Sequence, residues 1–308
     1  MMRVRHRGRE MEKVKEMLSG VFAPLTTPFE GDEVSYERFA SNIEKLNASG
    51  LKGYFVLGTN GEYKSLSVPE RLELLKTAAT HRAADKAFMA GTGMESTKET
   101  IEMTRRAADI GVDMVSLLMP HFFARRIGDE VLVRYITEVA DHSPVPVLIY
   151  NNPSVAAGIT VSPEVVRRVS THQNVVGMKD SSSGNYTKYL EAAAEGFYVL
   201  AGSAGFFLAL LQAGGIGGVL SLANVFPDVC AELFALFTQG KTEEAAGLSA
   251  RIVGLNKVVS GSGGVASVKA AMDIMGFYGG EPRRPISGVT AEQKEVLKKE
   301  LIERGFLH

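Results

Sequence analysis

Val175-Val176-Gly177-Met178-Lys179-Asp180 is a short apolar run that ends in an amine and a carboxylate. A run of this length without polar alternation is typical of a buried strand, so it predicts Lys179 at a strand end. Desolvation favours the neutral form of a lysine, and only the neutral amine can add to a carbonyl carbon. The segment therefore indicates Schiff-base chemistry at Lys179. The alternative interpretation is a surface ion pair between Lys179 and Asp180.

Seven further apolar runs of similar length lie along the chain, separated by amphipathic stretches of helical period. Continuous hydrophobicity is what a parallel strand needs when helices cover both faces of its sheet, whereas a one-sided antiparallel strand alternates polar and apolar residues. The pattern predicts eight βα units. Besides the run at 175–178, the predicted strands are residues 21–25, 53–57, 87–90, 114–118, 145–149, 198–201 and 218–222.

The stretches between these runs carry helix-start signals. Ser67 stands before a proline, Ser96 is followed by Glu99 in a capping-box pattern, and Ser162 precedes Pro163. Serine is a preferred N-cap, and proline is favoured in the first helical turn because its missing N–H would be unpaired there. Helices are therefore predicted to begin after Ser67, Ser96 and Ser162.

Eight alternating units favour an α/β fold, a TIM (β/α)8 barrel with a C-terminal helical extension. A doubly wound open sheet is the alternative, but it often carries a glycine-rich loop after its first strand, and residues 24–28 are Pro-Leu-Thr-Thr-Pro. We predict an N-terminal tail over residues 1–18, a barrel over 19–225 and a helical segment over 226–308. The helices predicted in that last segment are residues 228–239, 243–259, 265–275 and 291–304.

The composition of the chain limits the classes of molecule that it is expected to bind. The chain of 308 residues has 34 Lys and Arg against 35 Asp and Glu, so its net charge of −1 gives no global field for nucleic acid or anionic membranes. The single cysteine, Cys230, excludes an internal disulfide framework, and the histidines show no paired spacing for zinc. No apolar stretch has the length of a membrane span. We predict a cytoplasmic protein without a metal, with a small-molecule substrate.

A barrel carries its chemistry at the carboxyl ends of its strands, and reactive residues follow several predicted strands here. An amine, a phenol, hydroxyls and backbone amides freed by glycine are predicted to converge on one face. Such a set suits a 2-oxoacid, with its carbonyl and its carboxylate. The segments are Gly58-Thr59-Asn60-Gly61-Glu62, Tyr150-Asn151-Asn152-Pro153, Lys179-Asp180-Ser181 and Gly202-Ser203-Ala204-Gly205.

These segments, in this order on eight βα units, resemble the dihydrodipicolinate synthase and N-acetylneuraminate lyase family from about residue 20 to the carboxyl end. The resemblance implies that Lys179 forms a Schiff base with pyruvate or another 2-oxoacid, without an organic cofactor. It further implies that Tyr150 transfers protons and that Thr59 and Asn60 bind the substrate carboxylate. A homotetramer is also implied.

Within that family the sequence looks most like the 4-hydroxy-2-oxoglutarate aldolases. The stretches that carry this likeness are residues 58–62, 178–181, 199–206 and 276–280. By this likeness Ser181 approaches the substrate carboxylate, Gly202 belongs to the substrate-binding set, and Val219 lines the pyruvate pocket.

Two departures from the family pattern bear on specificity. Pro120 is followed by His121-Phe122-Phe123, where family members carry a relay tyrosine. We suggest that His121, a water molecule or a substrate hydroxyl completes the proton path instead. Residues 154–157 are Ser-Val-Ala-Ala, where the lysine-pathway synthases carry an arginine for a second carboxylate. The open alternatives are that synthase reaction, a sugar-acid dehydratase or aldolase, and a weakly active protein that binds an oxoacid.

Each site residue also has a purely structural interpretation. Thr59 and Asn60 suit a tight turn, because Asn-Gly is a common turn pair. Val219 suits core packing, and Tyr150 suits an ordinary aromatic at a strand end. Asp180 is expected at the surface or in a helix cap. Glu62 is expected to be a structural carboxylate that caps nearby amides rather than a general base.

Overall fold

The structure is a computed structural model that describes residues 11–182, 184–261 and 263–307. The predicted tail falls partly on residues 1–10, which lie outside the described residues. Residues 11–18 are helical and lead into the first strand.

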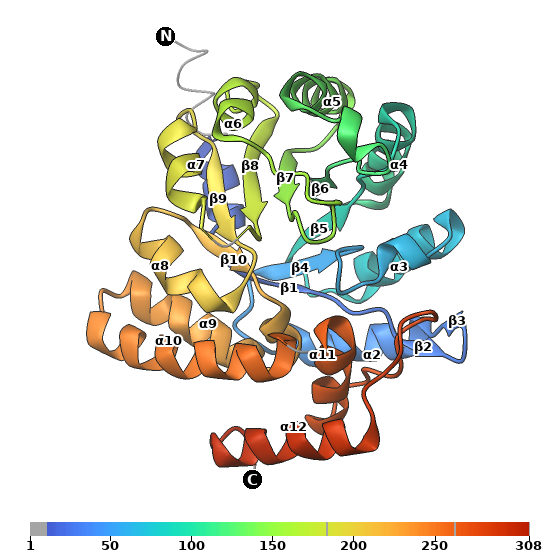
Figure 1. Cartoon of the computed structure of the whole chain (residues 1–308), viewed down its shortest axis with the longest axis vertical. Helices are drawn as coiled ribbons and strands as arrows, with labels where there is room; N and C mark the ends of the chain where they lie inside the picture. Colours follow the sequence, from blue (N-terminus) through green and yellow to red (C-terminus); the bar gives the residue numbers. More distant parts are fainter. Residues whose placement is uncertain (1–10, 183, 262, 308) are drawn as a thin grey trace. The chain divides into compact units, whose positions relative to one another are not determined.

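Eight strands form a closed parallel barrel in the order β1-β10-β9-β8-β7-β6-β5-β4 (Figure 1). This confirms the predicted TIM (β/α)8 barrel. The predicted strand positions are confirmed with small shifts at their ends. The strands are Gly20–Pro24 (β1), Gly53–Val56 (β4), Ala87–Gly91 (β5), Met114–Leu118 (β6), Val147–Asn151 (β7), Val175–Asp180 (β8), Tyr198–Ala201 (β9) and Gly217–Val219 (β10).

The contacts divide the chain into two compact units. Unit 1 comprises residues up to Gly20, Met89–Gly202 and Ala209–Gly218. Unit 2 comprises Val21–Phe88, Ser203–Leu208 and Val219–His308. The predicted boundaries after residues 18 and 225 stay a prediction.

In unit 1, four helices surround β6 to β9 (Figure 1). The register pairs Leu118 with Tyr150 between β6 and β7, and Tyr150 with Lys179 between β7 and β8. Every residue of β6, β7 and β8 is buried, as their continuous hydrophobicity predicts. The helices are Thr97–Ile110 (α4), Asp129–His142 (α5), Pro163–Val169 (α6) and Tyr186–Ala192 (α7), with a short turn at Ala124–Arg126 (η2).

Close backbone packing in β8 depends on Gly177. A Cβ atom at this position would lie 2.3 Å from the carbonyl oxygen of Tyr198 on β9, closer than any real contact. Glycine therefore lets β8 and β9 approach at this point. The strand continues from there through Met178 to Lys179 and Asp180.

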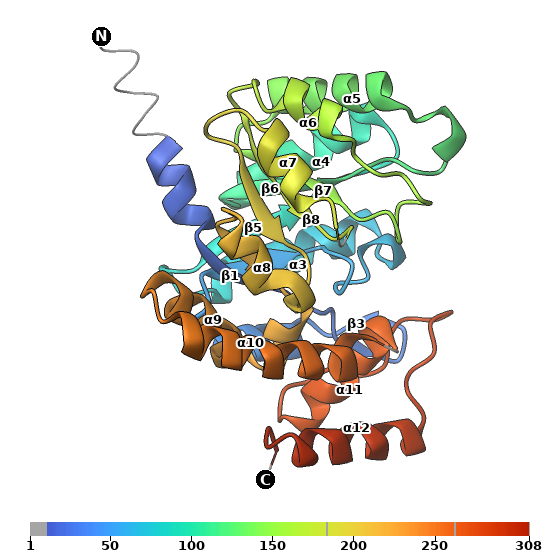
Figure 2. The ribbon, with the colours of Figure 1, turned by 60° about the vertical axis from the view of Figure 1, so that its left-hand side comes forward.

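In unit 2, the barrel strands are accompanied by a hairpin and by the C-terminal helices. The hairpin, Phe29–Glu30 (β2) with Glu33–Val34 (β3), was not predicted. The four predicted C-terminal helices are confirmed, and α12 packs beside α11 (Figure 2). The helices are Tyr36–Asn47 (α2), Val68–His81 (α3), Pro227–Thr238 (α9), Thr242–Asn256 (α10), Gly264–Ile274 (α11) and Ala291–Glu303 (α12); short turns are Tyr63–Ser65 (η1), Ala204–Phe206 (η3) and Ser221–Asn224 (η4). Two further elements are Phe207–Gln212 (α8), which the division between the units crosses, and a π-helical turn at Lys257–Gly261 (η5).

The predicted helix starts are confirmed at all three serines. The Ser67 hydroxyl accepts the Glu70 N–H at α3, and the Glu70 carboxylate accepts the Ser67 N–H, which completes a capping box. Ser96 accepts the Glu99 N–H at α4, and Ser162 caps α6. These caps satisfy N–H groups that have no partner within the helix.

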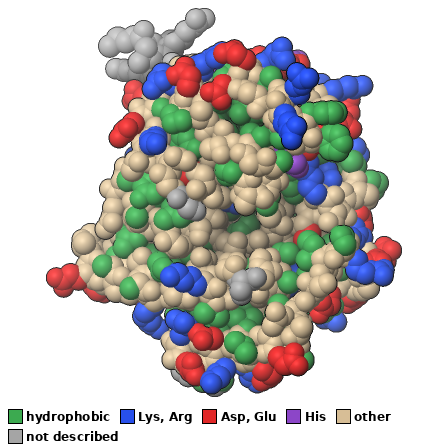
Figure 3. Space-filling model, in the orientation of Figure 1, with side chains coloured by type: hydrophobic (Ala, Val, Ile, Leu, Met, Phe, Trp, Pro, Cys, Tyr) green, Lys and Arg blue, Asp and Glu red, His purple; other side chains and the backbone are tan. Residues whose placement is uncertain are grey.

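Charge is distributed as the near-zero net charge suggests. On the face in Figure 3, acidic and basic side chains of the described residues are interspersed. Among the described residues, no helix combines the length and the hydropathy that crossing a membrane requires.

Replacing Glu70 with glutamine should lower stability in a pH-dependent way. The Arg283 guanidinium donates to both carboxylate oxygens of Glu70, at 2.6 and 3.1 Å, and this lowers the pKa of Glu70 to about 2. A lowered folded-state pKa stabilises the fold above the unfolded value of about 4.3, and this contribution is lost as the pH falls through the folded value. We expect Glu70→Gln to cost about 1–2 kcal/mol at pH 7 and almost nothing near pH 2, measured by denaturant unfolding.

Glutamine keeps the capping acceptor, so the change isolates the ion pair. The control is Glu73→Gln, which removes an exposed partner of Lys76 on the same helix and should change stability by less than about 0.5 kcal/mol. Equal losses for Glu70→Gln at pH 7 and near pH 2 would contradict the assignment.

Candidate active site

Tyr150 and Lys179 lie side by side on neighbouring strands of unit 1. They are paired residues in the β7–β8 register, and the Lys179 Nζ atom lies 4.0 Å from the centroid of the Tyr150 ring. Tyr150 is 3% exposed and Lys179 is 4% exposed. The two predicted catalytic residues therefore share one buried location at the strand ends, and the surface interpretation of Lys179 is wrong.

Asp180 is buried, which corrects the expectation that it lies at the surface or in a helix cap. Because β8 extends through Asp180, this residue is fully covered. One carboxylate oxygen, Oδ1, accepts the Asn151 Nδ2 amide at 2.8 Å and the Ser182 N–H at 3.0 Å. Asp180 therefore ties the end of β8 to the end of β7.

Asn151 is the centre of this network, although no sequence pattern indicated a role for it. Its side-chain Nδ2 amide also donates to the Tyr189 hydroxyl at 3.1 Å. Its side-chain oxygen, Oδ1, accepts the Val161 N–H at 3.0 Å. Burial, with the nearby charge of Asp180, raises the pKa of Tyr189 to about 12, so this phenol stays protonated. Asn151 and Asp180 directly follow Tyr150 and Lys179, so the network fixes the two site residues through their backbones.

The Tyr150 hydroxyl is oriented by Asn152. The Asn152 amide donates to that hydroxyl at 2.9 Å, and the Ser154 hydroxyl donates to the Asn152 carbonyl oxygen at 2.7 Å. The phenol oxygen accepts this hydrogen bond, and a phenol can both accept and donate. The second asparagine of the Tyr-Asn-Asn-Pro segment thus has a definite contact with the phenol, which sequence alone did not assign.

Ser181 and Gly202 meet at the ends of β8 and β9. The Gly202 N–H donates to the Asp180 carbonyl oxygen at 2.7 Å. A Cβ atom at Gly202 would lie 1.9 Å from the Ser181 Oγ atom and 2.7 Å from the Asp180 carbonyl oxygen, so the fixed backbone leaves room only for glycine. The structure brings together these two predicted substrate-binding residues, and Ser181 stands two positions after Lys179 in the sequence.

His121 is held by Glu95, which no sequence pattern indicated. One Glu95 oxygen, Oε2, accepts the N–H groups of His121 and Phe122, each at 2.9 Å. The His121 Nδ1 atom lies 3.3 Å from the other Glu95 oxygen and 3.0 Å from the Met119 carbonyl oxygen. Phe122 and Phe123 form an edge-to-face pair and are 77% and 69% exposed.

The remaining predicted residues belong to unit 2. Thr59 and Asn60 follow β4 in a tight turn, in which the Gly61 N–H donates to the Gly58 carbonyl oxygen. Asn60 is 8% exposed, and its Nδ2 donor has no hydrogen-bond partner among the described residues. Val219, at the end of β10, is fully buried, as its core-packing interpretation expects.

Glu62 is a structural carboxylate, as expected. Its Oε2 atom accepts the backbone N–H of Arg283 at 2.9 Å, and its Oε1 atom lies 2.6 Å from the Lys269 Nζ atom. Both side chains of this ion pair are buried. Sequence patterns did not indicate Lys269.

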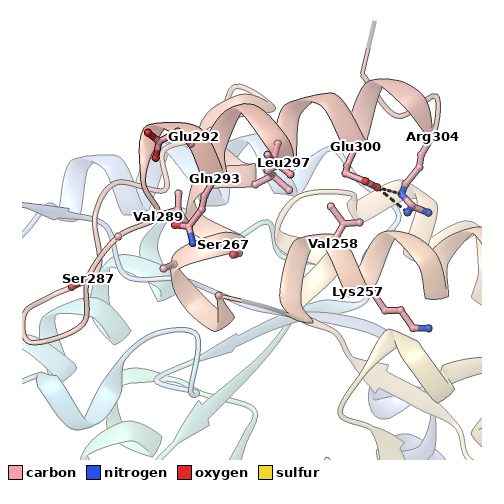
Figure 4. Close-up of a pocket in the computed structure, with 14 residues that line it drawn as sticks. Lys257, Val258, Ser267, Ser287, Val289, Glu292, Gln293, Leu297, Glu300 and Arg304 are labelled. Carbon is pink, nitrogen blue, oxygen red and sulfur yellow. Dashed lines mark hydrogen bonds and ion pairs between the residues drawn. The ribbon is translucent and has the colours of Figure 1, made fainter.

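Unit 2 also contains a cavity of about 680 Å³ between η5, α11 and α12 (Figure 4). Apolar residues such as Val258 and Leu297 line it together with Lys257 and the ion-paired Glu300 and Arg304. No predicted site residue lines it. In the described part of the chain, no three His, Cys, Asp or Glu side chains gather in a way that could hold a metal ion.

Comparisons with known proteins show which family this chain resembles. The sequence model of the Dihydrodipicolinate synthetase family matches residues 17–304. The probable mitochondrial 4-hydroxy-2-oxoglutarate aldolase of Emericella nidulans is 33% identical over 298 residues, which cover 94% of this chain and 96% of the relative. The 4-hydroxy-tetrahydrodipicolinate synthase of Caldicellulosiruptor bescii is 28% identical, over 94% of this chain and 98% of the relative.

A solved structure shows the same architecture. A prophage protein of the dihydrodipicolinic acid synthase family from E. coli K12, solved in complex with pyruvate, superimposes with a TM-score of 0.87 at 25% identity. The match covers 94% of this chain and 99% of that protein. Together with the barrel, these likenesses define the class: the protein is an enzyme, a lyase built on a (β/α)8 barrel. The chain belongs to the dihydrodipicolinate synthetase family.

Proposed function

We propose that the protein is a Schiff-base lyase that cleaves or forms a carbon–carbon bond of a 2-oxoacid, in the manner of a 4-hydroxy-2-oxoglutarate aldolase. The observation that carries this proposal is the buried pair of Lys179 and Tyr150, with the amine 4.0 Å from the ring centroid. The aldolase named among the relatives and the pyruvate bound to the structural neighbour support it.

In the proposed reaction, the neutral Lys179 amine adds to the keto carbon, and the hydroxyl of the resulting carbinolamine takes up a proton and leaves as water to give an iminium ion. The iminium accepts the electron pair of the C3–C4 bond, while the C4 hydroxyl loses its proton and an aldehyde departs. The resulting enamine takes a proton at C3. Hydrolysis then releases pyruvate and restores the amine. Tyr150 is the proposed proton-transfer group, because Asn152 orients its hydroxyl and the Lys179 amine lies 4.0 Å from its ring centroid.

Four residues are proposed to bind the substrate carboxylate. Thr59, Asn60 and Ser181 offer side-chain donors, and Gly202 belongs to the same proposed set. The buried Asn60 amide donor without a partner among the described residues supports this role, since buried polar groups are normally paired. Val219 is proposed to line the pyruvate pocket.

The lysine-pathway synthase reaction is the second candidate, supported by the synthase from Caldicellulosiruptor bescii. It is disfavoured by residues 154–157, which offer no guanidinium for a second carboxylate. A sugar-acid dehydratase or aldolase requires the same imine. A protein that only binds an oxoacid without turnover would explain the absent relay tyrosine. A panel of 2-oxoacids with detection of released pyruvate separates these activities.

The proposal also covers the substrate, the cofactors, the cellular location and the assembly of the protein. We propose a small-molecule 2-oxoacid substrate, no organic cofactor and no metal, no nucleic acid and no membrane, a cytoplasmic location and a homotetramer. The exposed aromatic pair of Phe122 and Phe123 supports self-association, because exposed apolar groups on a surface are typical of interaction sites. Sedimentation in solution measures the assembly.

Incubation with pyruvate and borohydride tests the proposal directly. Borohydride reduces an imine to a stable secondary amine, so mass spectrometry of the peptide that contains Lys179 should show the added pyruvate group. An adduct with turnover supports the lyase. A protein that releases pyruvate from aldol substrates but never forms a trapped adduct would require a different mechanism, and absence of both would favour the binding protein.

His121 is proposed to complete the proton path in place of the relay tyrosine. We expect His121→Ala to lower turnover about 10-fold or more and to change the pH–rate profile, because a phenol is a poor base when its proton cannot be passed on. The matched control is His172→Ala, which removes another partly buried histidine with a carboxylate neighbour, Asp141. An unchanged profile and turnover in His121→Ala removes this histidine from the scheme.

A further inference from the structure

We infer that Lys269, on helix α11, is a positioning residue whose ion pair with Glu62 holds the loop of residues 57–62 in the conformation that presents Thr59 and Asn60 to a substrate carboxylate. This inference rests on the proposed function for the identity of the substrate. It assigns a role to a residue far from the strand ends in sequence.

The ion pair is built into the interior of unit 2. The Lys269 Nζ atom lies 2.6 Å from the Glu62 Oε1 atom, and the side chains are 0% and 1% exposed. The same amine donates to the Glu281 carbonyl oxygen at 3.0 Å and lies 4.5 Å from the centroid of the Phe29 ring. Burial lowers the pKa of Lys269, and the negative charge of Glu62 opposes this shift. The charged form of Lys269 is therefore stabilised by its contacts with Glu62, the Glu281 carbonyl oxygen and the Phe29 ring.

The loop needs such a constraint, because its backbone is unfavourable at both ends. Leu57 and Glu62 have φ values of 62° and 50°, in the left-handed region that residues with a Cβ atom rarely adopt. Conformations of this kind persist only when neighbouring groups fix them, and they concentrate at functional sites. The Thr27 hydroxyl donates to the Gly61 carbonyl oxygen at 2.7 Å, so it holds one side of the loop.

The other side of the loop is held by the Glu62 carboxylate. Its two oxygens contact two different segments, α11 through Lys269 and the following connection through the Arg283 N–H. Only one residue separates Glu62 from Asn60, so a shift of this carboxylate would displace the Asn60 amide. A buried ion pair contributes little net stability compared with apolar residues of similar volume, and it can instead specify one conformation. This favours a positioning role.

Three variants separate positioning from simple stability. Lys269→Met alone leaves the Glu62 charge buried without its cation, so it is expected to unfold readily. The double variant Glu62→Gln/Lys269→Met removes both charges and should recover much of the lost stability. Glu62→Gln alone is the milder change, because the amide keeps an acceptor for Lys269. Lys86→Met is the matched control: it removes a buried lysine of the same unit that donates to the carbonyl oxygens of Ser49 and Leu51.

Two measurements are made on each folded variant. Hydrogen exchange of the peptide covering residues 57–64 reports the order of the loop without any assumption about the reaction. The pyruvate concentration for half-maximal borohydride trapping, and the maximal trapping rate, report the site. In the double variant we expect loop amides to exchange at least 10-fold faster and the half-maximal concentration to rise at least 10-fold, with the maximal rate within about threefold of the parent. Glu62→Gln should show smaller changes in the same direction, and Lys86→Met neither change.

Unchanged loop exchange in the folded double variant, or in Glu62→Gln when the double variant does not fold, would overturn the inference. Faster exchange with an unchanged half-maximal concentration would also overturn it, because the loop would then not present the carboxylate-binding residues. If Lys86→Met changes loop exchange and the half-maximal pyruvate concentration as much as the double variant does, the cause is general destabilisation and the inference fails. If the parent protein forms no adduct, the proposed function fails, and loop exchange still decides whether Lys269 positions the loop.

Discussion

Lys179→Met is expected to abolish the trapped pyruvate adduct and to lower turnover by a factor on the order of 10³ or more. Methionine has a similar length and no amine, so the imine cannot form. The side chain is 4% exposed and methionine has a similar volume, so the variant is expected to stay folded. The measurements are mass spectrometry after borohydride reduction, steady-state turnover and thermal unfolding.

Lys188→Met provides the comparison for this variant. Lys188 is exposed on α7 in the same unit, so its loss should change neither the adduct nor the turnover. An adduct that persists in Lys179→Met on another lysine would refute the assignment of the nucleophile. A loss of adduct accompanied by unfolding would require repetition with Lys179→Arg, whose guanidinium has a similar reach but cannot act as the amine nucleophile.

Tyr150→Phe is expected to reduce turnover about 10²- to 10⁴-fold while the protein stays folded. Phenylalanine keeps the ring that lies 4.0 Å from the Lys179 amine, and it removes only the hydroxyl that accepts the Asn152 hydrogen bond. Because the amine remains, the adduct should still form, but more slowly. Single-turnover trapping with pyruvate separates the slower proton transfer from imine formation.

Tyr135→Phe controls for the loss of a buried hydroxyl. Tyr135 is buried on α5, where its hydroxyl lies 3.0 Å from the Thr100 hydroxyl, so the change removes a comparable hydrogen bond. It should cost about 1 kcal/mol of stability and leave turnover nearly unchanged. If Tyr150→Phe turns over at the rate of Tyr135→Phe, the phenol does not transfer the rate-limiting proton.

Most strands were predictable because burial on both faces leaves a local apolar signature. The errors lie at strand ends, where tertiary contacts decide. The strand predicted at 145–149 is observed as Val147–Asn151, which moves Tyr150 and Asn151 into the ladder. The run predicted at 218–222 ends as a strand at Val219, because Ser221–Asn224 forms a short helical turn. The β2–β3 hairpin is too short to produce a periodic pattern.

The candidate site was predictable in its residue types but not in its supporting contacts. Lys179 and Tyr150 follow apolar runs, and that local pattern indicated them. Asn151, Glu95 and Lys269 act through partners from other elements, so nothing in their own neighbourhoods marks them. Asp180 was expected at the surface because a charge after a strand is usually exposed, and the extension of β8 reversed this.

The residues alone specify the alternation of strands and helices, the helix starts and the reactive groups at the strand ends, because hydrophobic period, capping and side-chain chemistry are local properties. Folding is needed to pair Tyr150 with Lys179 in register, to bury Asp180 and to bring Glu62 against Lys269. Strand register is set when distant segments pack against one another. The burial of a charged group likewise requires neighbours from several parts of the fold, which together exclude water from it.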